Sequence, residues 1–440
     1  MNLYDTVIQG RILQDGKLVE RNICISDGRI SRIQVLEPSN GEYDSMRRMG
    51  RRIILPGALD LHTHMREPGS GKEEDISSGT ASAAFGGVCA VIDMPNTHPP
   101  TVDRKSFLEK KERAGSSAHV DIGLNVALLD GTDPAGLRTI LEDPYLAGFK
   151  VFLGESTGSL VLRNHGRLMQ FVRELKANGL FISIHAEDGS LFRSRVGGGG
   201  DILERHLLRR PAEAELSAVR IVYRELKGNE DMVHFLHISS ASGLEEAVRG
   251  NATVEVTPHH LLLDVKKCQR SLENGALAKV NPPIRTSEDR ARLWQGIRSG
   301  EVSTIGSDHA PHLLEEKEGE DPPSGMPGVE TMVPLLLMEV KRRALELGKL
   351  QELVSEGPAK RAGLPGRGAL MEGFIADLFV IDMNRVGKVR ADDLHSRCGW
   401  SAYEGMEAIF PEMVMARGDV IVEDENLCSR PGRGRGLRES

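Results

Sequence analysis

Short apolar runs alternate with longer amphipathic stretches from about residue 55 to residue 362. The runs have the length of buried strands, and the stretches between them have the spacing of helices. The predicted helices cover 101–114, 163–178, 211–227, 242–248 and 287–299. The predicted strands begin with the run at 53–55 and continue at 90–93, 121–126, 148–152, 181–185, 234–237, 253–256 and 303–305. Eight strands alternating with helices predict parallel βα units closed into a TIM-like (β/α)8 barrel.

Both ends of the chain have a different pattern. Residues 1–54 contain short apolar clusters separated by Asp15-Gly16 and Asp27-Gly28, a dipeptide typical of hairpin turns. Strand-like patterning returns after residue 365, at 376–382, 413–417 and 420–422. We therefore expect residues 1–54 and 363–428 to form one small β-sandwich domain, and residues 55–362 to form the barrel. The last stretch, SRPGRGRGLRES at 429–440, is rich in glycine and arginine and predicts a disordered basic tail.

Composition narrows the class of protein. The formal net charge of -8 argues against a general nucleic-acid binder, which would normally be basic. Five dispersed cysteines without a CxxC spacing favour reduced thiols in a cytoplasmic protein. The N-terminus does not have the pattern of a signal peptide, and no apolar run is long enough for a membrane span. We expect a cytoplasmic protein with a small-molecule substrate and neither a nucleic-acid nor a membrane partner.

Polar residues stand at the ends of several predicted strands, where barrel active sites are found. In DLHTHMREPG, two histidines are one residue apart, and alternation along a strand points both imidazoles to one side. A single histidine, lysine or aspartate at such a place is commonly a structural residue. Six of them on alternating βα units predict one shared site, made of His62, His64, Lys150, His185, His237 and Asp308.

Four histidines, one lysine and one aspartate suit a site for two metal ions. Neutral imidazole favours zinc and similar ions. Because an ammonium would repel a dication, we interpret Lys150 as N6-carboxylysine, a carbamate that can bridge two metals. Two such ions would generate a bridging hydroxide near neutral pH and polarise a carbonyl. Asp308 would act as the general base and then as the general acid.

Arg66 follows the second histidine by two residues and has two interpretations. Its guanidinium is suited to a substrate carboxylate, but it could equally form a surface salt bridge with Glu67, Glu73, Glu74 or Asp75. Polar residues on other strand-end loops, which could complete a pocket or be ordinary turn residues, are Asn96, Asn281 and His312.

The chain resembles the dihydroorotases of the amidohydrolase superfamily, of the class I type found in archaea and many bacteria. The matching motifs are DLHTHMREPG, MPNTHPP, FKVFLGESTG, ISIHAEDGS, HFLHISS, EVTPHHLLL, KVNPPIR, GSDHAPH and GMPGVET, with ADLFVID and GWSAYEG in the closing β domain. The resemblance implies two Zn²⁺ per subunit. One ion would bind His62, His64 and Asp308, the other His185 and His237, with Lys150 bridging. It also implies that substrate contacts Arg66, Asn96, Asn281 and His312, with backbone from Pro327 and Gly328.

The implied reaction is the reversible cyclisation of N-carbamoyl-L-aspartate to L-dihydroorotate plus water, in pyrimidine biosynthesis. A homodimer is implied as well, and association with an aspartate transcarbamoylase stays open. One alternative is a related hydantoinase, dihydropyrimidinase or allantoinase, which share the ligands but generally lack the arginine. Another is a non-catalytic scaffold paralogue. The charged stretch before the GMPG motif, within 313–328, is either a lid over the site or a solvated loop.

Overall fold

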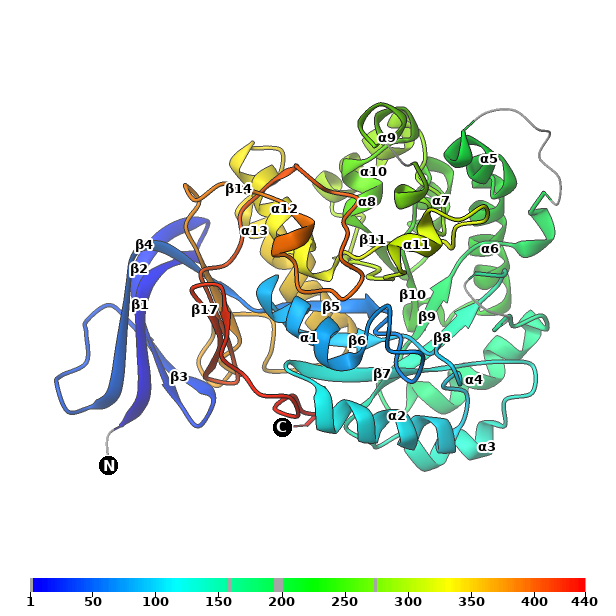
Figure 1. Ribbon diagram of the computed structural model, residues 1–440. Helices are drawn as coiled ribbons and strands as arrows, with labels where there is room; N and C mark the ends of the chain where they lie inside the picture. Colours follow the sequence, from blue (N-terminus) through cyan, green and yellow to red (C-terminus); the bar gives the residue numbers. More distant parts are fainter. Residues whose placement is uncertain (1–2, 157–159, 194–200, 273–274, 440) are drawn as a thin grey trace.

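The computed structural model describes residues 3–156, 160–193, 201–272 and 275–439. Its centre is a parallel barrel sheet in which strands of consecutive βα units lie side by side (Figure 1). A bridge between Thr63 and His309 joins the first strand to the segment after the last one. The barrel strands are β5 (Ala58–Thr63), β6 (Val88–Asp93), β7 (Asp121–Ala127), β8 (Leu146–Phe152), β9 (Ile182–His185), β10 (Val233–Phe235), β11 (Thr253–Val256) and β12 (Thr304–Ile305).

The prediction of a (β/α)8 barrel is confirmed, but the first strand was placed too early. The apolar run at 53–55 ends β4 (Tyr43–Pro56), which pairs antiparallel with β13 (Leu378–Ile381) in the other sheet. The barrel begins at β5, after Gly57. A Cβ on Gly57 would lie 2.5 Å from Cys89 Sγ, so a larger residue would not fit where the chain crosses between the two sheets.

Helices surround the barrel (Figure 1). Three of them begin at a reciprocal capping box that the sequence carries: Asp75 with Ser78, Asp103 with Ser106, and Thr286 with Asp289. The helices are α1 (Ile76–Phe85), α2 (Arg104–Ser117), α3 (Pro134–Leu137), α4 (Leu168–Lys176), α5 (Ile202–Arg209), α6 (Ala212–Glu225), α7 (Ala241–Ala247), α8 (Pro258–Leu262), α9 (Val265–Ser271), α10 (Ser287–Ser299), α11 (Leu314–Lys317), α12 (Val329–Lys341), α13 (Leu347–Gln351) and α14 (Gly357–Arg361).

Both ends of the chain build a second sheet beside the barrel (Figure 1). Side chains from its N-terminal and C-terminal strands share one apolar cluster that includes Ile8, Ile23, Ile54, Leu378 and Met415, as predicted for a domain made by both termini. Its strands are β1 (Tyr4–Gln14), β2 (Lys17–Ser26), β3 (Arg29–Gln34), β4, β13, β16 (Met413–Ala416), β17 (Asp419–Glu423) and β18 (Asn426–Leu427). A separate ribbon pairs β14 (Gly387–Lys388) with β15 (Glu407–Ala408).

The prediction of a disordered tail is wrong for residues 429–439. Gly436 forms a parallel bridge with Ile122 at the start of β7, and the amide of Arg435 donates to Asp121 Oδ1 at 3.0 Å. Leu437 is 2% exposed and packs with inward-facing residues of β5, β6 and β8. The tail therefore closes the end of the barrel at which the strands begin.

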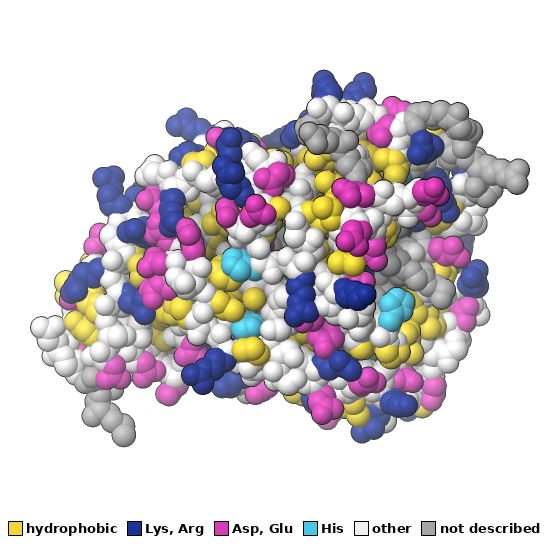
Figure 2. Space-filling model, viewed as in Figure 1, with side chains coloured by type: hydrophobic (Ala, Val, Ile, Leu, Met, Phe, Trp, Pro, Cys, Tyr) yellow, Lys and Arg dark blue, Asp and Glu magenta, His cyan; other side chains and the backbone are white. Residues whose placement is uncertain are grey.

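Charges of both signs are mixed over the face shown in Figure 2, without one dominant basic area. Among the described residues, no helix is long and apolar enough to cross a membrane.

Candidate active site

The six residues predicted to share a site converge where the barrel strands end. His62 lies in β5, Lys150 in β8 and His185 at the end of β9. His64 directly follows β5, while His237 and Asp308 lie two and three residues after the ends of β10 and β12. All six are buried, with exposed fractions between 1% for His62 and 8% for His64. Barrel geometry therefore gathers side chains that lie up to 246 positions apart in the chain.

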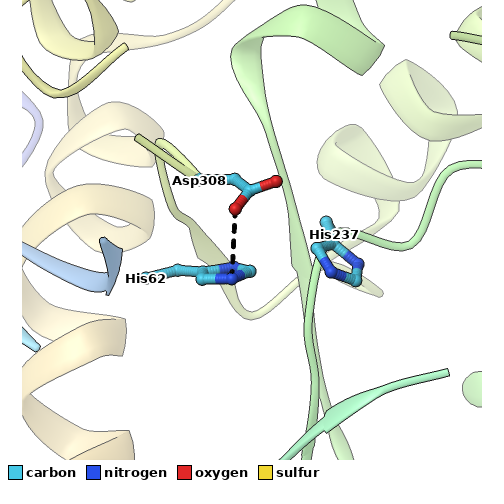
Figure 3. Close-up of side chains that lie close together, drawn as sticks. All are labelled: His62, His237 and Asp308. Carbon is cyan, nitrogen blue, oxygen red and sulfur yellow. Dashed lines mark ion pairs between the residues drawn. The ribbon is translucent and has the colours of Figure 1, made fainter. Parts of the chain in front are cut away.

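Asp308 lies between the two histidines of the first strand. Its Oδ1 is 3.2 Å from Nε2 of His62 and 3.2 Å from Nε2 of His64. Figure 3 shows His62 and His237 approaching Asp308 from different elements, and potential ligand atoms of these three residues lie within 4.8 Å of one another.

His185 and His237 form the other half of the cluster. Nδ1 of His185 lies 3.0 Å from Nε2 of His237. Nδ1 of His237 is buried and has no hydrogen-bond partner among the described residues. Asp308 and His237 also have positive φ angles, 46° and 38°, which are uncommon for residues with a side chain. Strain of this kind is found where the surrounding structure fixes a functional geometry.

Burial sets the protonation of the cluster. It lowers the pKa values of His62, His64 and His237 well below the ordinary value, so these imidazoles are neutral, as metal ligands must be. Burial raises the pKa of Asp308 to about 7, although the Lys150 ammonium opposes that rise. Burial also lowers the pKa of Lys150 to about 7, against the effect of Asp308 and Glu255.

Three polar residues hold the imidazoles in orientation. Nδ1 of His62 is 2.9 Å from Glu255 Oε1, and Nδ1 of His64 is 2.6 Å from Asn96 Oδ1. Nε2 of His185 is 3.1 Å from Glu187 Oε2, which also binds Arg210. Such partners fix the ring tautomer and leave the other nitrogen free for a metal.

Sequence reasoning missed Glu255 and Glu187. The sequence does contain a sign that Glu255 has a special role. It lies between Val254 and Val256 in a buried strand, where a carboxylate needs a polar partner. Asn96 was predicted to contact substrate, and its side chain binds His64 as well as lining the pocket.

A cavity opens onto the cluster. Arg66, with φ of 58°, lies on its wall, and its Nε donates to the carbonyl of Pro311 at 3.0 Å. The proposed surface salt bridge of Arg66 is wrong: no carboxylate of the described residues pairs with it. Glu67 pairs with Arg113, Glu74 with His309 and Asp75 with Arg397, while Glu73 accepts a hydrogen bond from Ser70.

The remaining predicted substrate residues divide into two groups. Asn281 lines the cavity, and His312 lies directly behind the wall, with Nε2 3.1 Å from an Arg66 nitrogen. Pro327 and Gly328 instead line a separate small pocket behind His309, where the Gly328 amide donates to His309 Nδ1 at 3.1 Å. The cavity lining also includes Phe152, Ser156, Ala310, Ser324 and Gly325, which the sequence did not single out.

The residues of the cluster fit a metal centre. Neutral imidazole nitrogens and a carboxylate oxygen converge, one buried imidazole nitrogen has no partner, and outer carboxylates hold the rings. Lys150 Nζ faces the Phe152 ring at 4.8 Å and forms no salt bridge with any described carboxylate.

Comparison with known proteins agrees with this geometry. Residues 53–421 match the amidohydrolase family. A dihydroorotase of Methanosarcina acetivorans is 36% identical, covering 98% of this chain and 94% of that protein. A dihydroorotase of Archaeoglobus fulgidus is 34% identical, covering 95% of this chain and 97% of that protein. Among solved structures, an L-hydantoinase of Arthrobacter aurescens is 28% identical with a TM-score of 0.91, over 98% of this chain and 99% of that one. The chain belongs to the amidohydrolase family, within its dihydroorotase group.

Proposed function

We propose that this protein is a zinc-dependent dihydroorotase that interconverts N-carbamoyl-L-aspartate and L-dihydroorotate plus water. The observation that carries the substrate assignment is Arg66. It lies on the cavity wall beside the histidine cluster and has no carboxylate partner within the described chain. A guanidinium held there without a counter-ion is stabilised by a ligand that brings its own carboxylate.

The chain's own residues have distinct roles in this proposal. Arg66 binds the substrate carboxylate, Asn96 and Asn281 contact the polar ring, and His312 supports Arg66 from behind. In hydrolysis the ring C–N bond breaks, and Asp308 first takes a proton from water and then delivers it to the leaving nitrogen.

The ligand assignment is part of the same proposal. One zinc ion would be held by His62, His64 and Asp308 and a second by His185 and His237. The carboxylated form of Lys150 would be shared between them. When bound, the two ions would acidify water and polarise the carbonyl under attack. The amine of Lys150 must be neutral to react with carbon dioxide. Burial lowers the pKa of Lys150 to about 7, so the neutral amine is available near pH 7. Zinc content by metal analysis and carbon-13 NMR after labelled bicarbonate test these two points.

The first experiment is the ultraviolet assay of L-dihydroorotate loss, with hydantoin, dihydrouracil and allantoin as parallel substrates. Loss of dihydroorotate alone supports the proposal. Turnover only of a ring without a carboxylate would favour a hydantoinase-type activity, the function of the structural neighbour from Arthrobacter aurescens. No turnover by zinc-loaded protein would favour the scaffold alternative.

Asp308→Asn tests the acid–base role. The amide cannot exchange a proton at neutral pH, so we expect turnover to fall by at least about a hundredfold. Metal analysis of the variant must show that zinc is retained. Turnover within about tenfold of wild type, a barrier change of only about 1.4 kcal/mol, would contradict the assignment.

The family resemblance also supports a cytoplasmic homodimer. Sedimentation of the purified chain, alone and mixed with an aspartate transcarbamoylase, tests the dimer and decides whether the two proteins associate.

A further inference from the structure

Lys317 is a buried lysine close to the cavity that the proposed chemistry does not use. It ends α11 and is 0% exposed. Its ammonium donates to three backbone carbonyls, those of Lys279 at 3.1 Å, Pro323 at 2.9 Å and Gly325 at 2.9 Å. An ammonium has three N–H donors, so all of them are used within the protein.

These three carbonyls belong to two segments that form one wall of the cavity. Ser324 and Gly325 line it, and Asn281, two residues beyond Lys279, lines it as well. The amide of Gly325 also donates to the carbonyl of Lys279 at 2.9 Å, which joins the segments directly. Lys317 therefore sits at the point where both parts of this wall meet.

The wall is closely packed at Gly325. Its φ of 142° disfavours any residue with a side chain, and a Cβ there would lie 2.4 Å from the carbonyl oxygen of Ala310. The neighbouring carbonyl of Ser324 lies 3.1 Å from His312 Nε2. A shift of this segment would therefore move His312, whose Nε2 also lies 3.1 Å from an Arg66 nitrogen and bonds only one of these two partners at a time.

Trp400, in the GWSAYEG motif, supports the same wall from the C-terminal part of the chain. It is 5% exposed, and its Nε1 donates to the carbonyl of His312 at 2.7 Å. Its ring lies 5.5 Å from Lys317 Nζ, within the range of a cation–π contact. One aromatic side chain thus contacts both the lysine and the loop that carries His312.

We propose that Lys317, supported by Trp400, is a positioning residue that sets the substrate-binding wall of the cavity, and that substrate affinity depends on it. This inference rests on the proposed function for its kinetic test. In this arrangement the buried Lys317 ammonium holds residues 323–325 from the side of the protein interior. Removal of the ammonium leaves the carbonyls of Pro323 and Gly325 without this donor and leaves that of Lys279 with only the Gly325 amide, and the wall relaxes toward solvent.

Lys317→Met keeps the length of the side chain and removes its donors. We expect the KM for L-dihydroorotate to rise at least about tenfold, with kcat within about threefold and zinc content unchanged. Lys341→Met is the matched control, because Lys341 also donates to a backbone carbonyl, that of Met383, but is exposed and outside the cavity lining. A fall in kcat with an unchanged KM would overturn the inference.

Hydrogen exchange of residues 312–326 gives a readout that does not depend on activity. We expect faster exchange of this segment in Lys317→Met and no change in Lys341→Met; equal exchange in wild type and Lys317→Met would overturn the inference. Should Lys317→Met fail to fold, Trp400→Phe replaces it, since it removes the hydrogen bond to His312, keeps an aromatic ring beside Lys317, and should raise both the KM and the exchange rate. Absent dihydroorotase activity in wild type would refute the proposed function, and hydrogen exchange would still decide the role of Lys317.

Discussion

Arg66 is the residue on which substrate choice depends. Its guanidinium is held from behind by Pro311 and His312, so its free edge is available to a ligand. A hydrogen bond to a charged group contributes roughly 1.5–3 kcal/mol, so Arg66→Ala should weaken dihydroorotate binding by about 10- to 100-fold. Steady-state KM values or inhibitor titration measure this. Arg113→Ala, which removes a neighbouring surface arginine, is the control, and an unchanged affinity in Arg66→Ala would refute the assignment.

Glu255 is expected to act on the metal through His62. Glu255→Gln keeps the shape of the side chain but weakens the hydrogen bond to His62 Nδ1. Loss of such an outer partner usually costs 10- to 100-fold in metal affinity. Competition with a zinc chelator should show a loss of this size, and Glu245→Gln, at an exposed glutamate, should show none. Equal zinc affinity in Glu255→Gln and wild type would show that His62 is oriented without Glu255.

The six residues of the histidine cluster could be predicted because each stands at or near the end of a strand. The apolar pattern of a single strand is enough to locate such a position. Their supporting partners could not be predicted in the same way. Glu187 lies only two residues after His185, but its partner Arg210 comes from the end of α5, and nothing local connects the two. Likewise, only the fold shows that the carboxylates next to Arg66 have other partners.

At the scale of elements, α2 is joined to β6 by a fully buried ion pair. Lys110 Nζ lies 2.6 Å from Asp93 Oδ2, and Asp93 Oδ1 accepts from the amide of Met65, between His64 and Arg66. Removal of one partner from a buried pair costs about 3–5 kcal/mol. Urea unfolding of Lys110→Met should show a loss of that order. The double variant with Asp93→Asn should lose less than the sum of the two single variants, and additive losses would contradict a coupled pair.

Most of the longer helices with one buried face could be predicted, although α5 was missed, whereas helices buried on most sides could not. The spacing predicted α2, α6 and α10 within a few residues. It missed α1, in which only the two serines after Ile76 are not buried, and α12, an apolar run that contains Pro334. A helix that is apolar on most sides has no amphipathic stripe, so periodicity cannot distinguish it from a buried strand.

At the scale of the whole molecule, the tail shows how composition can mislead. Its glycines suggested disorder, yet the chain needs them: a Cβ on Gly434 would lie 2.0 Å from the carbonyl oxygen of Val120. Asp121, at the start of β7, accepts from the amide of Arg435 and pairs with Arg367 and Arg417. The sequence could not reveal these contacts, because they join residues up to 314 positions apart in the chain.

Leu437 should stabilise the barrel without affecting catalysis. It fills the end at which the strands begin, against Leu59, Ala147 and Phe181, while the candidate active site lies at the opposite end. Truncation of a buried leucine to alanine costs about 2–5 kcal/mol, so Leu437→Ala should lower the free energy of unfolding by that amount in urea titration. The KM and kcat of the folded variant should stay within about twofold of wild type. Leu427→Ala, at an exposed leucine in β18, is the matched control. Equal free energies of unfolding for Leu437→Ala and wild type would show that Leu437 does not contribute to the stability of the barrel.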